Sequence, residues 1–373
     1  MVTSLLTSKA LRSKYLSPTS YHNAINTNLK AVVIGATSGI GQGCAHRLAE
    51  QGYTVLAIGR PGIGRAEQII EELTAKSKSS AAALAIAAGG AATAAQIPAH
   101  EFYATDAFSL QQVHETAQEI LSKHPTIDVL VITQGMATTQ GFTPTKEGND
   151  EKMTLHYFSR IAIANALLPA LLSSSAENKH NSGSGSDSDS DSDSNNARMK
   201  KGPVVMSILS GGVHGPYENY QKDFSLEKNY SVKNAADAAG YYNDLGLDQM
   251  ACKKGNEGIN FVHASPGFVN TNWGSEFGTV LRCMVRMMQP LGKSPGDCAE
   301  YMLGPTVFAS QAGHDLPERL HFVNGNGNGN KGLFVMGEKG QSKSLTRMHT
   351  NEAKAFVWGK TVEVLKKAGI DIE

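Results

Sequence analysis

The stretch Ala31-Val32-Val33-Ile34-Gly35-Ala36-Thr37-Ser38-Gly39-Ile40-Gly41 decides the fold of this chain. An apolar run of the β type ends in a glycine-rich turn, and an amphipathic segment at 42–51 follows at once. Glycine lets the backbone turn sharply and approach a bound group that a Cβ atom would obstruct. The first turn of the next helix offers free N–H groups and the positive end of its dipole, which suits a pyrophosphate. The order of strand, glycine turn and helix predicts a dinucleotide site, with a surface glycine turn as the alternative.

The spacing Gly-x3-Gly-x-Gly differs from the GxGxxG of ordinary dehydrogenases. It resembles the short-chain dehydrogenase/reductase family, whose pattern is Thr-Gly-x3-Gly-x-Gly, with Ile34 here at the threonine position. Three further segments resemble the family's fourth strand, its fifth strand with the catalytic serine, and its Pro-Gly-x-Val-x-Thr loop: 127–135, 204–210 and 266–271. The resemblance covers about residues 29–272.

Alternating strand and helix patterns run through the chain. Strands are expected at 30–34, 54–58, 101–104, 128–132, 203–208 and 259–263, and helices at 40–51, 64–76, 109–123, 150–172 and 235–253. This alternation predicts an α/β fold with one doubly wound parallel sheet of the Rossmann type. Residues 332–336 fit a last edge strand, and residues 352–367 fit a closing helix.

The expected organisation is a single domain with additions. Residues 1–28 form an N-terminal arm, 29–272 the dinucleotide-binding domain, and 273–373 a lid and closing elements of the same domain. Two insertions are expected at 77–99 and 173–201. The second carries a Ser-Asp repeat with too few apolar residues to offset its ordering entropy, and we expect it to be disordered. The repeat lacks the glycine and closing glutamate of a calcium loop, so no metal site is predicted.

Composition narrows the class of protein. The 373 residues are 40% hydrophobic with a formal net charge of zero, so charge gives no case for nucleic acid. Four cysteines without a CxxC pattern are typical of reduced thiols in an intracellular protein, which favours the cytoplasm. No apolar run is long enough for a membrane span. The first 49 residues lack Asp and Glu, as in a mitochondrial transit peptide or an arm that packs beside the sheet.

Arg60 at the end of the second expected strand indicates the cofactor. A carboxylate there would bind the ribose hydroxyls of NAD. An arginine instead offers a planar, permanently charged group to a 2′-phosphate. The sequence therefore favours NADP (NADPH), with a solvated surface arginine as the alternative reading.

The family resemblance implies further cofactor contacts. Asp106 matches the aspartate that binds the adenine amino group, although it is equally well placed to cap the next helix. Gly135 matches the glycine beside the adenosine ribose, and the 266–271 loop closes over the nicotinamide. The residues expected to bind NADP(H) are Gly35, Thr37, Ser38, Gly39, Ile40, Gly41, Arg60, Asp106, Gly135, Pro266, Gly267, Val269 and Thr271.

The resemblance also implies catalytic positions. In the family, a Tyr-x3-Lys pair supplies the proton and binds the nicotinamide ribose, a serine polarises the carbonyl, and an asparagine holds a water. Ser210 stands at the serine position, and it is also a plausible turn residue. His156 stands at the asparagine position, where it is either a proton donor or a buried, hydrogen-bonded histidine.

The Tyr-x3-Lys signature itself is missing after Ser210. Laid without gaps, the pattern of the retinol-dehydrogenase-like branch places Ala236 at the tyrosine and Gly240 at the lysine. Divergent fungal members of the family look similar in this respect.

The sequence thus predicts an NADP(H)-dependent oxidoreductase with an atypical site. Its substrate is expected to be a small, fairly apolar carbonyl or alcohol. The alternative is a catalytically silent protein that binds NADP(H) as a sensor or as part of a complex. A homo-oligomer is compatible with both.

Overall fold

Both faces of the central strands are buried, which explains their continuous apolar sequences. In β1 (Lys30–Ile34), Val32 and Ile34 lie in one hydrophobic cluster, whereas Ala31 and Val33 lie in a second cluster on the opposite face. Successive side chains of a strand point to opposite faces. One strand therefore contributes to two separate cores, as in parallel sheets covered on both sides.

The computed structural model describes residues 29–62, 64–87, 97–181, 202–274, 277–308 and 332–372. Within them, a seven-stranded sheet has the order β3-β2-β1-β4-β5-β6-β7, and all neighbouring strands are parallel. The remaining strands are β2 (Thr54–Gly59), β3 (Glu101–Ala104), β4 (Val129–Ile132), β5 (Val204–Ile208), β6 (Asn260–Ala264) and β7 (Phe334–Met336). The predicted doubly wound sheet is confirmed.

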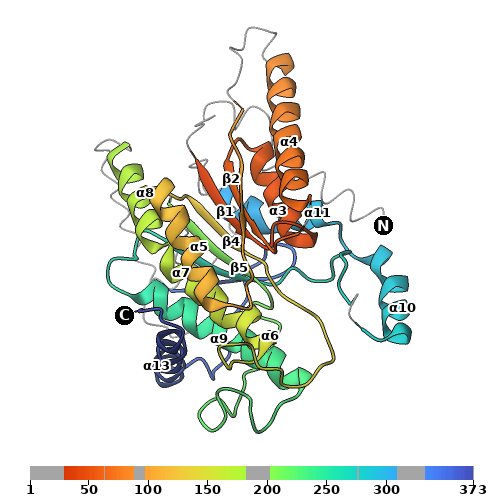
Figure 1. Cartoon of the computed structure of the whole chain (residues 1–373). Helices are drawn as coiled ribbons and strands as arrows, with labels where there is room; N and C mark the ends of the chain where they lie inside the picture. The colour runs from red at the N-terminus through yellow and green to blue at the C-terminus, as the bar shows by residue number, and fades with distance from the viewer. Residues whose placement is uncertain are drawn as a thin grey trace.

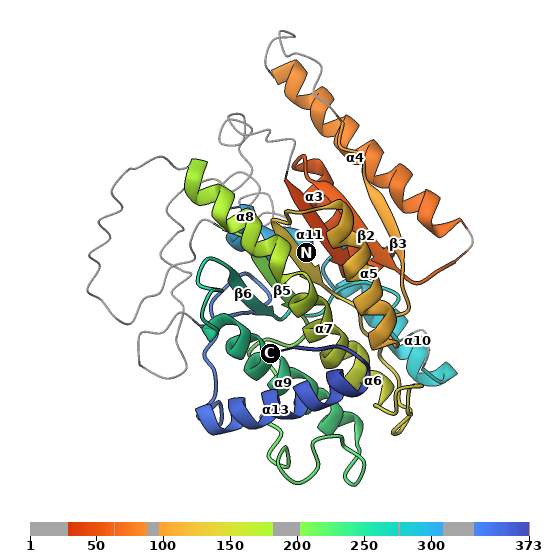
Figure 2. The same ribbon diagram turned by 60° about the vertical axis from the view of Figure 1, so that its left-hand side comes forward.

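Helices cover the sheet in two layers (Figures 1 and 2). One layer packs α3 (Gly39–Glu50) between α4 (Arg65–Ala87) and α11 (Pro295–Leu303). The other contains α5 (Leu110–Lys123), α7 (Ser159–Ala166), α9 (Val232–Cys252) and α13 (Asn351–Lys367). The remaining helical elements are α6 (Glu151–Met153), η1 (Thr154–Phe158), α8 (Leu168–Asn181), α10 (Thr279–Met288), η2 (Gln289–Leu291) and η3 (Gly304–Phe308).

Parts of both expected insertions are helical. α4 continues to Ala87, and Ser77 is buried with its hydroxyl donating to the carbonyl of Ala49 at 3.0 Å. α8 continues to Asn181, and Ser174 Oγ donates to Asp128 Oδ1 at 2.6 Å. The prediction of disorder for 173–201 is therefore wrong for 173–181, because serine hydroxyls anchor this helix where apolar side chains are few. Residues 1–28, 88–96 and 182–201 lie outside the described residues.

α10 has a mostly exposed apolar surface and stands away from the body of the molecule (Figure 1). Val285 is its one buried residue, whereas Met284, Met287 and Met288 are more than half exposed.

No single helix in the described ranges is long and apolar enough to cross a membrane. The segments 151–166 and 168–177 meet that test only together, across a 48° bend. Cys44 and Cys298 are buried, Cys252 and Cys283 are exposed, and all four are free thiols.

Acid should weaken the fold through His100. His100 Nδ1 accepts a hydrogen bond from the Val55 N–H at 3.1 Å, and burial lowers the pKa of His100 to about 4. In the unfolded chain the His100 ring takes up a proton below its ordinary pKa of 6.5. In the folded chain it stays neutral until the pH approaches 4, so acid favours the unfolded chain. We therefore expect acidification from pH 6.5 to pH 5 to lower the free energy of unfolding by about 1.5 kcal/mol through His100.

Urea unfolding of the unmodified protein and His100→Asn across this pH range measures the effect. Asparagine keeps an acceptor for Val55 but does not titrate, so the variant should lose less stability on acidification. Equal losses in the two proteins would contradict the assignment.

Candidate functional site

The turn between β1 and α3 depends on two glycines that touch. A Cβ atom on Gly41 would lie 2.2 Å from the carbonyl oxygen of Gly35, and Gly35 has a φ of +86°. Both positions therefore require glycine, because the start of α3 rests directly on the end of β1. Ser38 precedes α3 in an extended conformation and gives it no side-chain cap. The N–H groups of the first turn, which have no partner inside the helix, remain available to an anion.

A second loop reaches the same turn. Gly39 has a φ of +57°, and a Cβ atom on it would lie 3.1 Å from Thr271 Cγ2. Thr271 ends the Pro-Gly-x-Val-x-Thr segment, whose Val269 is buried and pairs with Lys293 in an isolated bridge. The segments that the sequence assigned to the pyrophosphate and to the nicotinamide are therefore neighbours.

Two arginines near the end of β2 differ in their contacts. Arg65 donates to the carbonyl oxygen of Thr37 and, at 2.8 Å, to Gln68 Oε1. The first of these hydrogen bonds stabilises the glycine turn. Arg60 is exposed and makes no hydrogen bond or ion pair with the described part of the chain. Its guanidinium is therefore free to bind a ligand phosphate.

Asp106 does not cap α5, contrary to one of its two expected roles. Ser109 is the capping residue, because its Oγ accepts from the Gln112 N–H, and Asp106 Oδ1 instead accepts from the Phe108 N–H at 3.0 Å. Gly135 follows β4, and a Cβ atom on it would lie 3.1 Å from His156 Nε2. A side chain at this position would therefore crowd the His156 ring.

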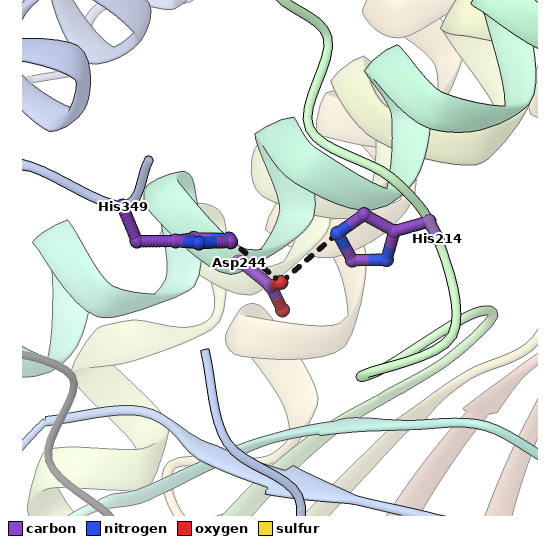
Figure 3. Close-up of side chains that lie close together, drawn as sticks. All are labelled: His214, Asp244 and His349. Carbon is purple, nitrogen blue, oxygen red and sulfur yellow. Dashed lines mark hydrogen bonds and ion pairs between the residues drawn. The ribbon is translucent and has the colours of Figure 1, made fainter. Parts of the chain in front are cut away.

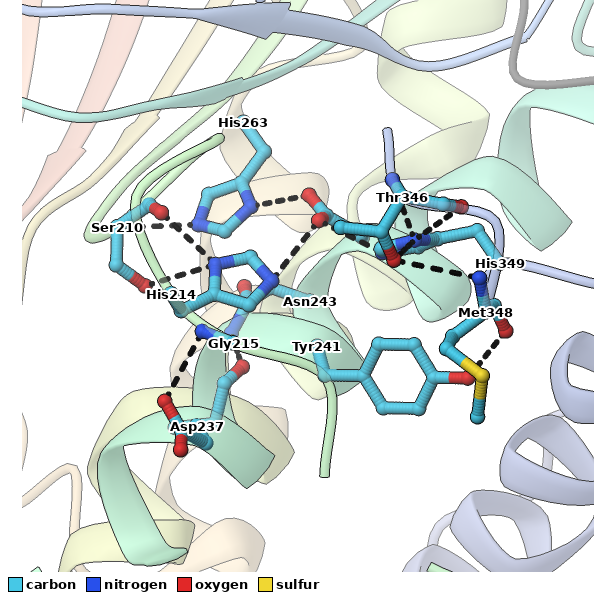
Figure 4. Close-up of polar contacts among 12 residues, drawn as sticks. Ser210, His214, Gly215, Asp237, Tyr241, Asn243, His263, Thr346, Met348 and His349 are labelled. Atoms are coloured by element: carbon cyan, nitrogen blue, oxygen red, sulfur yellow. Dashed lines mark hydrogen bonds and ion pairs between the residues drawn. The ribbon is translucent and has the colours of Figure 1, made fainter. Parts of the chain in front are cut away.

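Ser210 lies at the carboxyl edge of the sheet, beside the imidazole rings of His263 and His214 (Figure 4). Its N–H donates to His263 Nε2 at 3.3 Å. Its Oγ lies 3.5 Å from His214 Nδ1, and its carbonyl oxygen lies 2.8 Å from the same nitrogen. Among the described residues, no tyrosine hydroxyl or lysine ammonium hydrogen-bonds to Ser210.

The buried carboxylate of Asp244 holds three histidines (Figures 3 and 4). Asp244 Oδ2 lies 3.1 Å from His214 Nε2 and 3.1 Å from His349 Nε2, and Oδ1 lies 2.6 Å from His263 Nδ1. Burial by itself would raise the pKa of Asp244, but the three histidines outweigh it and hold this pKa well below its ordinary value. Asp244 is therefore ionised.

The hydrogen-bond partners assign the protons of two rings. The carbonyl of Ser210 can only accept, so His214 Nδ1 carries a hydrogen, and Nε2 carries another because it faces a carboxylate. Although burial opposes the charge, the hydrogen bond to Asp244 raises the pKa of His214. His263 Nε2 accepts from Ser210, so its single hydrogen is on Nδ1; burial lowers its pKa. His214 and Asp244 form a buried ion pair.

Gly240 is the residue of α9 that faces Ser210. A Cβ atom on Gly240 would lie 2.6 Å from Ser210 Oγ and 2.3 Å from His214 Cγ, whereas Ala236, one turn earlier, is exposed. The ungapped placement of Ala236 at the family tyrosine is therefore one helical turn out of register. Asp244 lies one turn beyond Gly240.

Tyr241 and Tyr242 do not point at Ser210. Tyr241 donates to the carbonyl of Met348 at 2.6 Å, and Tyr242 donates to the carbonyl of Phe224 at 3.3 Å. Both side chains are fully buried, and burial raises the pKa of each hydroxyl above its ordinary value. Their role is to fix α9 to its neighbours.

His156 is poorly suited to donate a proton. It lies in the π-helical turn η1, and its Nε2 accepts from the Met136 N–H at 3.0 Å. Burial, together with the nearby charges of Arg160 and Lys152, lowers its pKa to about 3. The ring is neutral at ordinary pH and holds the turn after Gly135, which agrees with the buried, hydrogen-bonded alternative.

A second buried charge, the guanidinium of Arg160, lies at the carboxyl edge of the sheet. Arg160, 1% exposed, donates to the carbonyl oxygens of Gln134 at 2.5 Å and Ile208 at 3.0 Å, and to Ser207 Oγ at 2.8 Å. Ser207 in turn donates to Asn243 Oδ1 at 2.9 Å. The ends of β4 and β5 are thereby joined to α9 next to Asp244.

The amino-acid sequence gives little indication of the cluster around Asp244. His214 lies four residues after Ser210, and Asp244 lies on the expected helix, so these two carried a weak signal. His263 reads as an ordinary strand residue. His349 lies 105 residues after Asp244, and no local pattern connects the two.

Known proteins resemble this chain along most of its length. A sequence model described as short chain dehydrogenase matches residues 29–90. An oxidoreductase of Emericella nidulans, AN1596, is 23% identical over 91% of this chain and 94% of that protein. An NmrA-like family domain-containing oxidoreductase of Aspergillus is 25% identical over 66% of this chain, which spans 62% of that protein. A solved structure of an uncharacterized Mycobacterium paratuberculosis protein shares the fold, with a TM-score of 0.53, 16% identity, and coverage of 92% of this chain and 95% of that chain.

Removing the hydroxyls of α9 should affect stability rather than chemistry. Tyr241→Phe and Tyr242→Phe each lose one hydrogen bond to a backbone carbonyl, at an expected cost of about 1–2 kcal/mol in the free energy of unfolding. NADPH affinity and any turnover should stay within about twofold, since neither hydroxyl faces Ser210. Urea unfolding and NADPH fluorescence titration measure both quantities. A large loss of turnover with intact NADPH binding would identify one of these tyrosines as the acid.

Proposed function

The chain belongs to the short-chain dehydrogenase/reductase family, and on this premise we propose that it is an NADP(H)-dependent oxidoreductase. It would interconvert a carbonyl and a hydroxyl group on a small, fairly apolar molecule. The observation that carries this proposal is the placement of the uncapped start of α3, behind the Gly35–Gly41 contact, at the same sheet edge as Ser210. In open α/β sheets, ligands bind at this edge.

The residues present fit the cofactor. The first turn of α3 would hold the pyrophosphate, Arg60 the 2′-phosphate, and the loop ending at Thr271 the nicotinamide side. When bound, the nicotinamide supplies or accepts the hydride. These segments already lie together, as the contact between Gly39 and Thr271 supports.

Ser210 would polarise the substrate carbonyl. Within the described part of the chain, its hydroxyl contacts no carboxylate and has a single long contact, with His214 Nδ1, so it can donate to a substrate oxygen. We assign Gly240 and Asp244 to the family's tyrosine and lysine positions, because Gly240 faces Ser210 and Asp244 lies one turn further along α9. The usual hydroxyl acid and ammonium are therefore replaced by a hydrogen atom and a carboxylate.

This replacement also favours the alternative, a silent NADP(H)-binding protein. General acid–base groups commonly contribute about 10²–10⁴-fold to the rate. Turnover on simple carbonyls should therefore be slow even when NADPH binds well. Steady NADPH oxidation over a panel of aldehydes, ketones and quinones, beside a direct binding measurement, separates the two functions. Binding without turnover on any of them identifies the silent protein.

NADPH should bind more tightly than NADH because Arg60 is free at the end of β2. Losing a charge-assisted contact costs on the order of 1.5–3 kcal/mol, so Arg60→Ala should narrow the preference at least about tenfold. Arg282→Ala, which removes a charge from the outlying α10, is the matched control. It should leave the preference for NADPH over NADH unchanged. Equal dissociation constants for the two cofactors in the unmodified protein would rule out NADP selectivity.

Ser210→Ala tests the site itself. On any substrate the panel identifies, turnover should fall by about 10²-fold, as for other lost polarising donors, while NADPH affinity is kept. Ser173→Ala, an exposed serine on α8, serves as the control. Unchanged turnover in Ser210→Ala would place the chemistry elsewhere.

A further inference from the structure

The cluster around Asp244 has the donors and spacing of a metal site (Figure 3). His214 Nε2 and His349 Nε2 each lie 3.1 Å from Asp244 Oδ2, and the three ligand atoms all lie within 4.8 Å of one another. Ligand atoms bound tetrahedrally to zinc at about 2.0–2.1 Å are about 3.3–3.4 Å apart. The two observed spacings are close to that separation.

Each of the three donors is already oriented by a further hydrogen bond. His214 Nδ1 lies 2.8 Å from the carbonyl of Ser210, and His349 Nδ1 accepts from the Thr346 N–H at 3.1 Å. Asp244 Oδ1 accepts from His263 Nδ1 at 2.6 Å. Metal-binding histidines almost always donate their second nitrogen to a carbonyl or carboxylate, and metal-binding carboxylates are hydrogen-bonded in turn. The surroundings of His214 and Asp244 meet this requirement. His349 is also held at Nδ1 by Thr346, but there the nitrogen accepts from the Thr346 N–H.

Burial strengthens the case. The side chains of His214, Asp244 and His349 are 4%, 1% and 3% exposed, and they come from the loop after β5, from α9 and from the segment before α13. An ordinary surface cluster of polar residues would be solvated. Here the donors converge in the interior, where two nitrogens compete for one carboxylate oxygen.

We propose that His214, Asp244 and His349 bind one divalent ion of the zinc type. The ion would replace the hydrogens that the two Nε2 atoms direct at Asp244 Oδ2. Two imidazole nitrogens with one carboxylate suit zinc and its first-row neighbours, whereas calcium and magnesium require more oxygen ligands. Three protein ligands leave one coordination position open, as in catalytic rather than structural zinc sites.

No metal site was expected from the sequence, because its one local pattern that suggests a metal is the Ser-Asp repeat, which lacks the glycine and glutamate of a calcium loop. Zinc at Asp244 would return a positive charge to the helix position where the family carries its lysine. This consequence rests on the proposed function. Metal binding itself does not, since it is measured without cofactor or substrate.

Bound metal is first removed from the full-length protein with a chelator, and the chelator is then removed. The protein is next incubated with Zn²⁺ or Co²⁺, and the unbound ion is removed by desalting. We expect close to one ion per chain. The Co²⁺ form should show the visible bands of a four- or five-coordinate ion with nitrogen and oxygen ligands, without thiolate charge transfer from the exposed Cys252 and Cys283. An unmodified protein that retains no ion would overturn the proposal and leave a purely hydrogen-bonded cluster.

Matched variants locate the ion. His349→Gln removes a ligand and should weaken Zn²⁺ binding at least about 100-fold, whereas His263→Gln disturbs only the orientation of Asp244 and should weaken it about 10–100-fold. His46→Gln, on α3 beside Glu72, is the control and should bind as the unmodified protein does.

NADPH binding and far-ultraviolet circular dichroism verify that each variant is folded, and His214→Gln replaces His349→Gln if the latter is not. Equal binding by the ligand variant and the control would place the ion elsewhere. Failure of NADPH binding in the unmodified protein would instead count against the proposed function, so the two failures are distinguishable.

Discussion

One ionised carboxylate, Asp244, organises the part of the molecule where chemistry is expected. It accepts hydrogen bonds from three imidazoles that belong to three separate segments of the chain. A buried charge without partners costs several kcal/mol, so these segments are positioned together or not at all. The position of Ser210 depends on this arrangement, because Asp244 fixes both rings that contact Ser210, those of His214 and His263.

The same edge of the sheet carries a buried cation, and a polar chain joins the two charges. Arg160 donates to Ser207, Ser207 donates to Asn243, and Asn243 precedes Asp244 on α9. Burial lowers the pKa of Arg160 to about 9, which leaves it charged at neutral pH. The asparagine amide also donates to the carbonyl of His156 at 2.6 Å, inside the π-helical turn. The site is therefore held by hydrogen-bonded polar groups at its base rather than by apolar packing alone.

Local sequence patterns predicted the strands, the main helices and the glycine turn, because each follows from a periodicity or a backbone requirement within a few residues. The helical ends of the two insertions were missed. Apolar content cannot report that Ser77 and Ser174 are tied to the core by hydroxyls. The catalytic register was also wrong by one turn, since only packing shows that Gly240 faces Ser210. His349 could not have been found at all, as its partner lies more than a hundred residues away.

The distance in sequence between Asp244 and His349 sets an order of events during synthesis. Most of the sheet, α9 and the rings of His214 and His263 leave the ribosome before the segment at 346–349 exists. Until that segment docks, Asp244 lacks one of its three imidazole partners. Domains generally fold as units as the chain emerges, so we expect the full set of partners around Asp244 to form only after this segment has been synthesised.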